Sequence, residues 1–294
     1  MIRRNDYMNL LYAGKGDNDV VKVVTGMRRC GKSTLLEMYM EELIESGIPK
    51  EDVFHLNLES KEGQSISDHR QLDEWLSRIP EDRQTYLFLD EIQNVEGWEL
   101  SVAAVGTMRL CDLYMTGSNS RMLSSELSTH ISGRYVEISM LPLSFKEYME
   151  LHPSDDIEGS FGLFLKFGSL PGVDPSRGER YCYDYLDGVF NSVLVKDVLE
   201  RRNLRSVRRL EGIARFLFSN IGNTTNDAAV SKGTGLNPTT TDSYIEGLTE
   251  GMLLHRAERY DIVGKKLMDT NGKYYATDLG VRNAALGGAE GTDI

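Results

Sequence analysis

The chain has 294 residues, enough for two domains, and its 40% hydrophobic and 27% charged residues are ordinary for a folded globular protein. Its formal net charge of −12 disfavours indiscriminate binding to nucleic acid or anionic membranes, so any contact with DNA requires a local basic patch. The 3 cysteines and 5 histidines are scattered, without the spacing of a zinc site or a Ser/His catalytic arrangement.

The amino-terminal segment, Met1–Asp6, lacks the apolar core of a signal peptide, and no run of the sequence is long enough to span a bilayer. The cysteines are odd in number and contain no CxxC pair, which fits a reducing compartment. We therefore expect a soluble, cytoplasmic protein with no membrane partner.

The strongest motif lies early in the chain. An apolar β-branched run, Val20–Val24, leads into Gly26-x-x-x-x-Gly31-Lys32-Ser33, and a helical pattern follows. This is the strand, loop and helix order of a phosphate-binding loop, or P-loop, in which backbone N–H groups and the start of the helix face the phosphates. The residues expected to bind nucleotide are Gly26, Met27, Arg28, Arg29, Cys30, Gly31, Lys32, Ser33 and Thr34.

Two side chains of this loop have specific expected roles. Lys32 would reach the β- and γ-phosphates of ATP, and Ser33 would supply an oxygen to Mg²⁺. The side chains of Arg28 and Arg29 are ambiguous, because they can also point outward and pair with acidic groups.

Four further strands are predicted after the P-loop, separated by helical stretches. The predicted strands are Asp52–Leu58, Thr85–Glu91, Asp112–Gly117 and Arg134–Ile138, and the helices lie near Leu72–Ile79, Trp98–Met108 and Arg121–Thr129. The alternation predicts an α/β fold, a P-loop NTPase core with a doubly wound parallel sheet, over residues 1–143.

The pattern changes after residue 143. Residues 144–220 are expected to be mostly helical, with helices at Tyr181–Val198 and Arg208–Asn220. Two short helices follow, with Asn237 as N-cap and Pro238 as first residue of the second. The strands Leu253–Tyr260 and Lys273–Ala276 complete a winged-helix module at 221–278, which leaves 279–294 as a tail.

The strand Thr85–Glu91 delivers two adjacent carboxylates at its carboxyl end, where ligands gather in open α/β sheets. Asp90 would hold Mg²⁺ through its water shell, and Glu91 would accept a proton from the water that attacks the γ-phosphate. The alternative is a solvated strand end. The P-loop upstream favours the catalytic interpretation.

Two further sites of the core leave alternatives open. Asn119, or Ser118 beside it, could orient the attacking water, but Gly-Ser-Asn is also an ordinary turn sequence. Arg134 could act as an arginine finger on the nucleotide of its own subunit or of a neighbour, or be an exposed arginine before a strand.

The segment Arg201–Arg209 is a local basic cluster just before the predicted winged helix, and it could touch phosphates. The second short helix carries Asp242, Glu246 and Glu250 but no Lys or Arg, which is a poor surface for reading DNA. We expect a solvated face or a contact with a protein partner.

Further motifs stand at Leu89–Trp98, Thr116–Ser120, Leu127–Tyr135, Leu141–Phe145, Tyr185–Val198 and Tyr274–Asn283. Together with Gly26–Thr34 they closely resemble a large bacterial and archaeal family of AAA+-type ATPases, over nearly the whole chain. The resemblance implies a nucleotide core followed by a C-terminal region with a winged helix. Within it, the implied roles are Walker A for Lys32 and Ser33, Walker B for Asp90 and Glu91, sensor for Ser118 and Asn119, and Gly-Arg motif for Arg134.

Members of that family often continue into a domain similar to restriction endonucleases, which we expect to be missing from this chain. The leading hypothesis is a Mg²⁺-dependent ATPase that binds ATP and ADP and acts as a switch. The alternative is a DNA-associated protein whose winged helix is regulated by nucleotide. A small-molecule kinase is disfavoured because the sequence between the predicted strands contains no Arg-rich segment that could form a lid over the substrate. Self-association is expected if Arg134 acts on a neighbouring subunit.

Overall fold

A computed structural model describes residues 2–109, 111–118, 133–202, 204, 206–258 and 272–288. The chain divides into two compact units, the first formed by Met1–Gly26 and Gly31–Met140 and the second by Met27–Cys30 and Leu141–Ile294. Met27–Cys30, in the middle of the P-loop, are thus assigned to the second unit, although the chain on both sides of them belongs to the first.

The first unit contains a parallel sheet of five strands in the order β2-β3-β4-β1-β5. The strands are β1 Val21–Gly26, β2 Val53–Asn57, β3 Tyr86–Asp90, β4 Asp112–Gly117 and β5 Tyr135–Met140. All neighbouring pairs are parallel, so the predicted fold class is confirmed. The order places β4 between β1 and β3.

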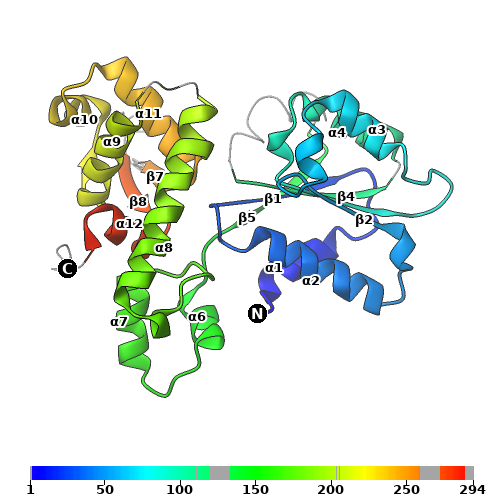
Figure 1. Cartoon of the computed structure of the whole chain (residues 1–294), viewed down its shortest axis with the longest axis horizontal. Helices are drawn as coiled ribbons and strands as arrows, with labels where there is room; N and C mark the ends of the chain where they lie inside the picture. The colour runs from blue at the N-terminus through cyan, green and yellow to red at the C-terminus, as the bar shows by residue number, and fades with distance from the viewer. Residues whose placement is uncertain are drawn as a thin grey trace, which may run out of the picture. The chain divides into compact units, whose positions relative to one another are not determined.

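Helices cover both faces of this sheet. They are α1 Asn5–Ala13, α2 Lys32–Glu45, α3 His69–Leu76 and α4 Trp98–Met108, with 3₁₀ turns at Lys50–Asp52, Gly63–Ser65 and Ile92–Asn94. Figure 1 shows α1 and α2 on one face and α3 and α4 on the other. The sequence patterns did not predict α1, and the helix predicted near Arg121–Thr129 lies outside the described residues.

Side chains of the buried strand β3 point alternately to the two faces of the sheet and pack against the helices on each face. Leu87 and Leu89 belong to the apolar cluster under α3 and α4, which also contains Trp75 and Trp98. Side chains next to them in sequence point to the other face. Phe88 therefore stacks on Tyr114 of β4, with ring centroids 5.0 Å apart, on the face covered by α2.

The second unit begins with helices. They are α6 Phe145–Leu151, α7 Ile157–Phe167, α8 Glu179–Ser192 and α9 Val207–Ser219, with a 3₁₀ turn at Pro175–Arg177. Wider π-helical turns at Val193–Glu200 continue α8, so the helix predicted at Tyr181–Val198 is present. The predicted tail begins with a helix, α12 Leu279–Ala285, whose Asn283 amide donates to the Leu165 and Lys166 carbonyls in α7.

The elements after α9 are β6 Thr224–Thr225, α10 Asp227–Thr234, α11 Pro238–Glu250, β7 Leu254–Glu258 and β8 Gly272–Ala276. The three strands form an antiparallel sheet in the order β6-β8-β7. Asn237 caps α11 by accepting from the Thr240 N–H, and Pro238 is its first residue, as predicted. This element order is typical of a winged helix, an assignment that stays a prediction. Among the described residues, no helix has the length and apolar character to cross a membrane.

Candidate functional site

The carboxyl ends of three adjacent strands bring the predicted core residues together. Gly26 ends β1, Asp90 ends β3, and Ser118 directly follows β4, which lies between them. This edge is where ligands bind in open parallel α/β sheets. The order of the strands therefore places the P-loop and the carboxylate pair on either side of the β4 end.

Lys32 connects the loop to the carboxylate pair. Its side chain is buried, with 3% of its surface exposed. Its Nζ donates to the Gly26 carbonyl over 3.0 Å and lies 3.6 Å from Oε1 of Glu91. A buried ammonium requires partners of this kind. Lys32 is thus placed between the two halves of the predicted site.

Two residues of the P-loop have positive φ values. Gly31, with φ of +105°, is the N-cap of α2, and Arg29 has φ of +70°. The left-handed region suits glycine, which has no Cβ to clash. The first residues of α2 are Lys32, Ser33 and Thr34, and the positive end of a helix favours an anion there.

The side chain of Arg28 has an acidic partner within the second unit. Its Nε lies 2.9 Å from Oδ2 of Asp197 and its Nη2 lies 3.3 Å from Oδ1. Asp197 stands in the π-helical turns and its side chain is fully buried. Of the two alternatives for the Arg28 side chain, the structure shows the pairing with an acidic group. Binding of phosphate by the Arg28 backbone N–H stays a prediction.

The Asp90 carboxylate is oriented by two neighbouring side chains. Its Oδ2 accepts from the Asn57 amide over 3.0 Å, and its Oδ1 accepts from the Thr116 hydroxyl. Hydroxyl and carboxylate oxygens are the donors that Mg²⁺ prefers, so Ser33 and a fixed Asp90 are chemically suited to a hydrated Mg²⁺ ion.

Glu91 is held in an unusual conformation. Its φ is +55°, a left-handed value that is rare for a residue with a side chain. Its N–H donates to the Thr116 hydroxyl oxygen over 2.9 Å, and its carboxylate accepts from the Gln93 amide. Only 7% of Glu91 is exposed. Strain of this kind persists only where surrounding contacts enforce it, and it is frequent at functional sites.

Thr116 and Gln93 are site residues that the sequence reasoning missed. Thr116 is fully buried and its one hydroxyl contacts both residues of the carboxylate pair. The signal available in the sequence was a hydroxyl side chain next to the carboxyl end of a strand, beside a predicted ligand-binding edge. Gln93 lies two positions after Glu91, in the 3₁₀ turn Ile92–Asn94, and its sequence position gave no indication that its side chain contacts Glu91.

We expect Thr116→Val to disturb the carboxylate pair. Valine keeps the shape but removes both hydrogen bonds, which leaves a buried N–H and a buried carboxylate oxygen unsatisfied and costs about 1–3 kcal/mol of folding stability. Chemical denaturation measures this loss, and Thr116→Ser, which keeps the hydroxyl, is the matched control. A valine variant as stable as wild type would contradict the role assigned to the hydroxyl.

The remaining predicted core residues have different positions. Ser118 is buried at the β4 end and its Oγ lies 3.5 Å from the Gln93 amide nitrogen, whereas Asn119 lies outside the described residues. Arg134 is exposed and directly precedes β5, where its carbonyl accepts from the Val21 N–H. Val21 and the P-loop stand at opposite ends of β1, roughly 17 Å apart at 3.3 Å per residue. Arg134 is therefore not brought to the site of its own subunit.

Two arginines of the basic cluster form ion pairs with carboxylates of the second unit. Arg201 lies 3.4 Å from the Asp197 carboxylate, and Arg202 contacts Glu246 and Glu250 of α11 at 2.9 and 2.5 Å. Two of the three carboxylates that argued against DNA on α11 are therefore engaged within the unit, which weakens that argument. The paired arginines are likewise occupied within the unit.

Two family models match the chain. One, described as an AAA domain, matches residues 18–149. The other, described as a domain of unknown function (DUF8612), matches residues 161–291. The first contains all of the core site residues considered above, and the second spans most of the C-terminal elements.

Two relatives extend the comparison. A protein of Haemophilus influenzae, described as uncharacterized, is 35% identical over 298 residues, which cover 98% of this chain and 74% of the relative. An uncharacterized protein of Methanocaldococcus jannaschii is 27% identical over 219 residues, which cover 69% of this chain and 47% of the relative. The chain thus spans about three quarters of one relative and about half of the other.

Similar solved structures include the Aeropyrum pernix ORC1 protein in complex with DNA, with a TM-score of 0.41 and 11% identity over 97% of this chain and 92% of that one. AMPPCP-bound DnaA from Aquifex aeolicus has a TM-score of 0.33 and 13% identity over 83% of this chain and 87% of that one. Both TM-scores are low, so neither protein's function is transferred to this chain.

Proposed function

This chain belongs to the AAA+-type P-loop ATPase family, and on that premise we propose that it binds ATP with Mg²⁺ and hydrolyses it to ADP and phosphate. The observation that carries the proposal is the position of Lys32, which contacts both the Gly26 carbonyl and the Glu91 carboxylate. This position supports the proposal because a buried lysine can bind a phosphate directly beside the carboxylate that would accept the proton of the attacking water.

Each residue of the site has a proposed part in the reaction. The loop N–H groups and Lys32 bind and orient the phosphates, and Glu91 accepts the proton of the water that attacks the γ-phosphorus. Gln93 and Thr116 hold Glu91 in place. Ser33 and Asp90 would hold a bound Mg²⁺, which supplies positive charge to the phosphate oxygens.

Arg134 is proposed to act on a neighbouring subunit. Because it lies at the opposite end of β1 from the P-loop of its own chain, an arginine-finger role requires self-association. We also propose that Asn119 orients the attacking water, and the only support for this role is its position in the sequence shortly after β4. The alternative function, DNA association through the winged helix and regulated by nucleotide, remains a separate proposal.

Replacing Lys32 tests the binding step. We expect Lys32→Ala to weaken MgATP binding by about 10–100-fold or more, because a charge-assisted contact to phosphate contributes about 1.5–3 kcal/mol. Isothermal titration calorimetry with a non-hydrolysable ATP analogue measures the change.

The control for this test is Lys50→Ala, which removes an exposed lysine outside the site and should bind like wild type. Circular dichroism of both variants shows whether weaker binding comes from the missing lysine contact or from unfolding of the variant. If folded Lys32→Ala binds MgATP with wild-type affinity, the assignment of the phosphate site is wrong.

A further inference from the structure

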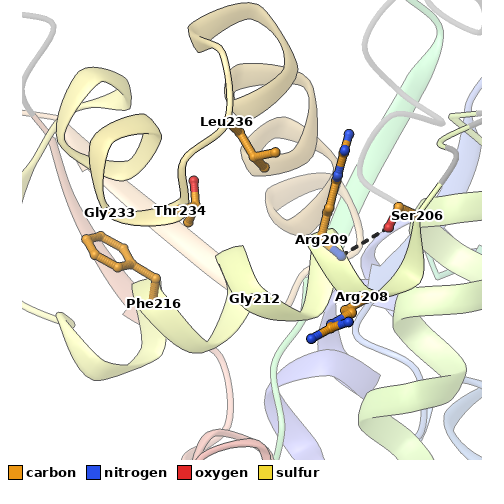
Figure 2. Close-up of a pocket in the computed structure, with 8 residues that line it drawn as sticks. All are labelled: Ser206, Arg208, Arg209, Gly212, Phe216, Gly233, Thr234 and Leu236. Atoms are coloured by element: carbon orange, nitrogen blue, oxygen red, sulfur yellow. Dashed lines mark hydrogen bonds between the residues drawn. The ribbon is translucent and has the colours of Figure 1, made fainter.

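A pocket lies within the second unit, away from the residues of the proposed ATP site. Its volume is ≈ 470 Å³. Its walls come from the first turns and middle of α9 and from the end of α10 with the turn that follows. Figure 2 shows the arginines at the Ser206 end of α9 and Phe216 further along the same helix. The size is within the usual range for small-ligand sites.

The basic groups of this pocket are Arg208 and Arg209. Both are exposed, and among the described residues neither has a carboxylate within ion-pair distance. In contrast, Arg201, Arg202 and Arg215 nearby are all paired with carboxylates. Arg208 and Arg209 stand in the first turn of α9, at the positive end of the helix. An anion would therefore be favoured at this end of the pocket.

The middle of the pocket is open because α9 has a glycine there. Gly212 lies in the interior of α9, where glycine costs roughly 1 kcal/mol relative to alanine. A Cβ at this position would have no heavy atom within 4 Å, so no neighbouring side chain of the described structure requires a glycine. The absent side chain leaves free surface along the pocket between the arginines and Phe216.

The far end of the pocket is apolar. Phe216 is half-buried and stands one helical turn beyond Gly212, and Leu236 lies across from α9. A Cβ on Gly233 would lie 2.5 Å from Cε2 of the Phe216 ring, so the close backbone of α10 fixes that ring. A fixed aromatic ring next to an open surface is suited to contact a flat, apolar group.

We propose that this pocket binds a nucleotide unit, with the phosphate at Arg208 and Arg209 and the base toward Phe216. The chemistry is that of a phosphate joined to a flat ring, and it can come from a free nucleoside monophosphate or from one unit of a single-stranded nucleic acid. Gly212 provides the space that the sugar crosses. The site is independent of ATP hydrolysis at the P-loop.

The test uses the full chain and two probes in the presence of saturating MgADP, which occupies the P-loop. A fluorescein-labelled oligothymidylate is followed by anisotropy at several salt concentrations, and UMP is followed by calorimetry. Gly212→Leu fills the pocket, and the double variant Arg208→Gln/Arg209→Gln removes its charge. We expect each to weaken binding at least tenfold, and the double variant to reduce the salt dependence of oligonucleotide binding.

The control variants make the same kinds of change, a glycine to leucine and a pair of arginines to glutamine, at exposed positions that do not line the pocket. Gly188→Leu alters an exposed glycine inside α8 whose Cβ would also meet nothing within 4 Å, and Arg177→Gln/Arg180→Gln removes two exposed arginines that do not line the pocket. Both should bind like wild type. Binding of UMP supports a free nucleotide as ligand, and binding of the oligonucleotide alone supports a strand. Absence of binding by both probes, or wild-type affinity in folded Gly212→Leu, would overturn the proposal.

Discussion

Replacing Glu91 with glutamine is expected to lower the rate of ATP hydrolysis by about 10²–10⁴-fold, the usual contribution of a general base. Glutamine keeps the size of the side chain and can still contact Gln93, but it cannot accept a proton. Glu91 is only 7% exposed and its backbone is held in the left-handed region, so a bulk-solvent base has no direct access to its position. Phosphate release under single-turnover conditions measures the rate.

Binding should respond differently from hydrolysis. Because Lys32 still donates to the Gly26 carbonyl, Glu91→Gln should bind MgATP within a few-fold of wild type. Glu37→Gln, an exposed change on α2, is the matched control and should leave both measurements unchanged. Hydrolysis by Glu91→Gln at close to the wild-type rate would show that another group accepts the proton. Loss of binding instead of turnover would show that Glu91 is structural.

The core of this protein could be predicted from its sequence because its signals are local. The P-loop glycines, the β-branched run before them and the carboxylates after β3 are each read from a few adjacent residues. Parallel strands with helices between them then require the strand ends to meet at one edge. This general geometry places Lys32 near Glu91, and in the structure the Lys32 Nζ lies 3.6 Å from Oε1 of Glu91.

The parts that escaped prediction depend on contacts between residues distant in the chain. Thr116 becomes important only because β4 is inserted between β1 and β3, which no local pattern determines. Likewise, the partner of Arg28 is Asp197, a residue 169 positions away, and nothing in the sequence indicates that the two residues meet. Counting charges along α11 was also incomplete: Glu246 and Glu250 were counted against DNA binding, but both form ion pairs with Arg202, 44 and 48 positions away.

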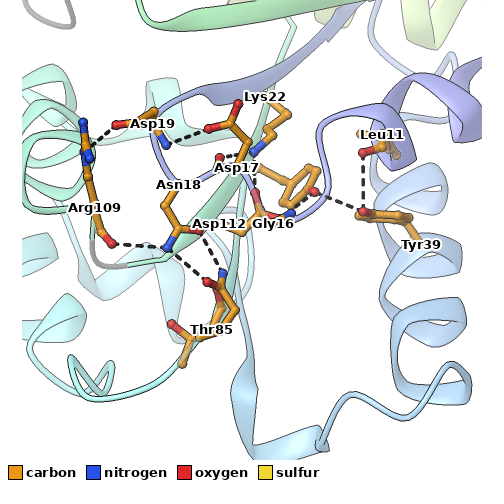
Figure 3. A network of polar contacts seen from close by, with 12 residues as sticks. Leu11, Gly16, Asp17, Asn18, Asp19, Lys22, Tyr39, Thr85, Arg109 and Asp112 are labelled. Carbon is orange, nitrogen blue, oxygen red and sulfur yellow. Dashed lines mark hydrogen bonds and ion pairs between the residues drawn. The ribbon is translucent and has the colours of Figure 1, made fainter.

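At the other end of the sheet, a buried ion pair joins β1 to β4. The Nζ of Lys22 lies 2.5 Å from Oδ1 of Asp112, and the two side chains are 2% and 0% exposed. Lys22 also donates to the Asp17 carbonyl, and the other Asp112 oxygen accepts from the Gly16 N–H and the Tyr114 hydroxyl. Figure 3 shows the contacts among Lys22, Asp112, Asp17 and Gly16 as one network. Burial raises the pKa of Asp112, against the lowering effect of Lys22.

Lys22→Met is expected to destabilise the protein by about 3–5 kcal/mol, because it leaves the Asp112 carboxylate buried without its cation. The same loss should depend on pH. In the variant the folded-state pKa of Asp112 lies even further above its unfolded value, so the loss grows as pH rises through that range and shrinks as Asp112 is protonated at lower pH. Chemical denaturation at pH 5 and pH 8 measures both effects.

Two further variants identify the origin of this loss. In Lys22→Met/Asp112→Asn no buried charge remains, so the double variant should be less destabilised than the two single changes summed, and its loss should vary little with pH. Arg78→Met breaks an ion pair with Glu62 whose side chains are 64% and 60% exposed, and it should cost at most about 1 kcal/mol. A Lys22→Met loss equal at both pH values would mean that packing, and not the unpaired carboxylate, determines the stability of this edge.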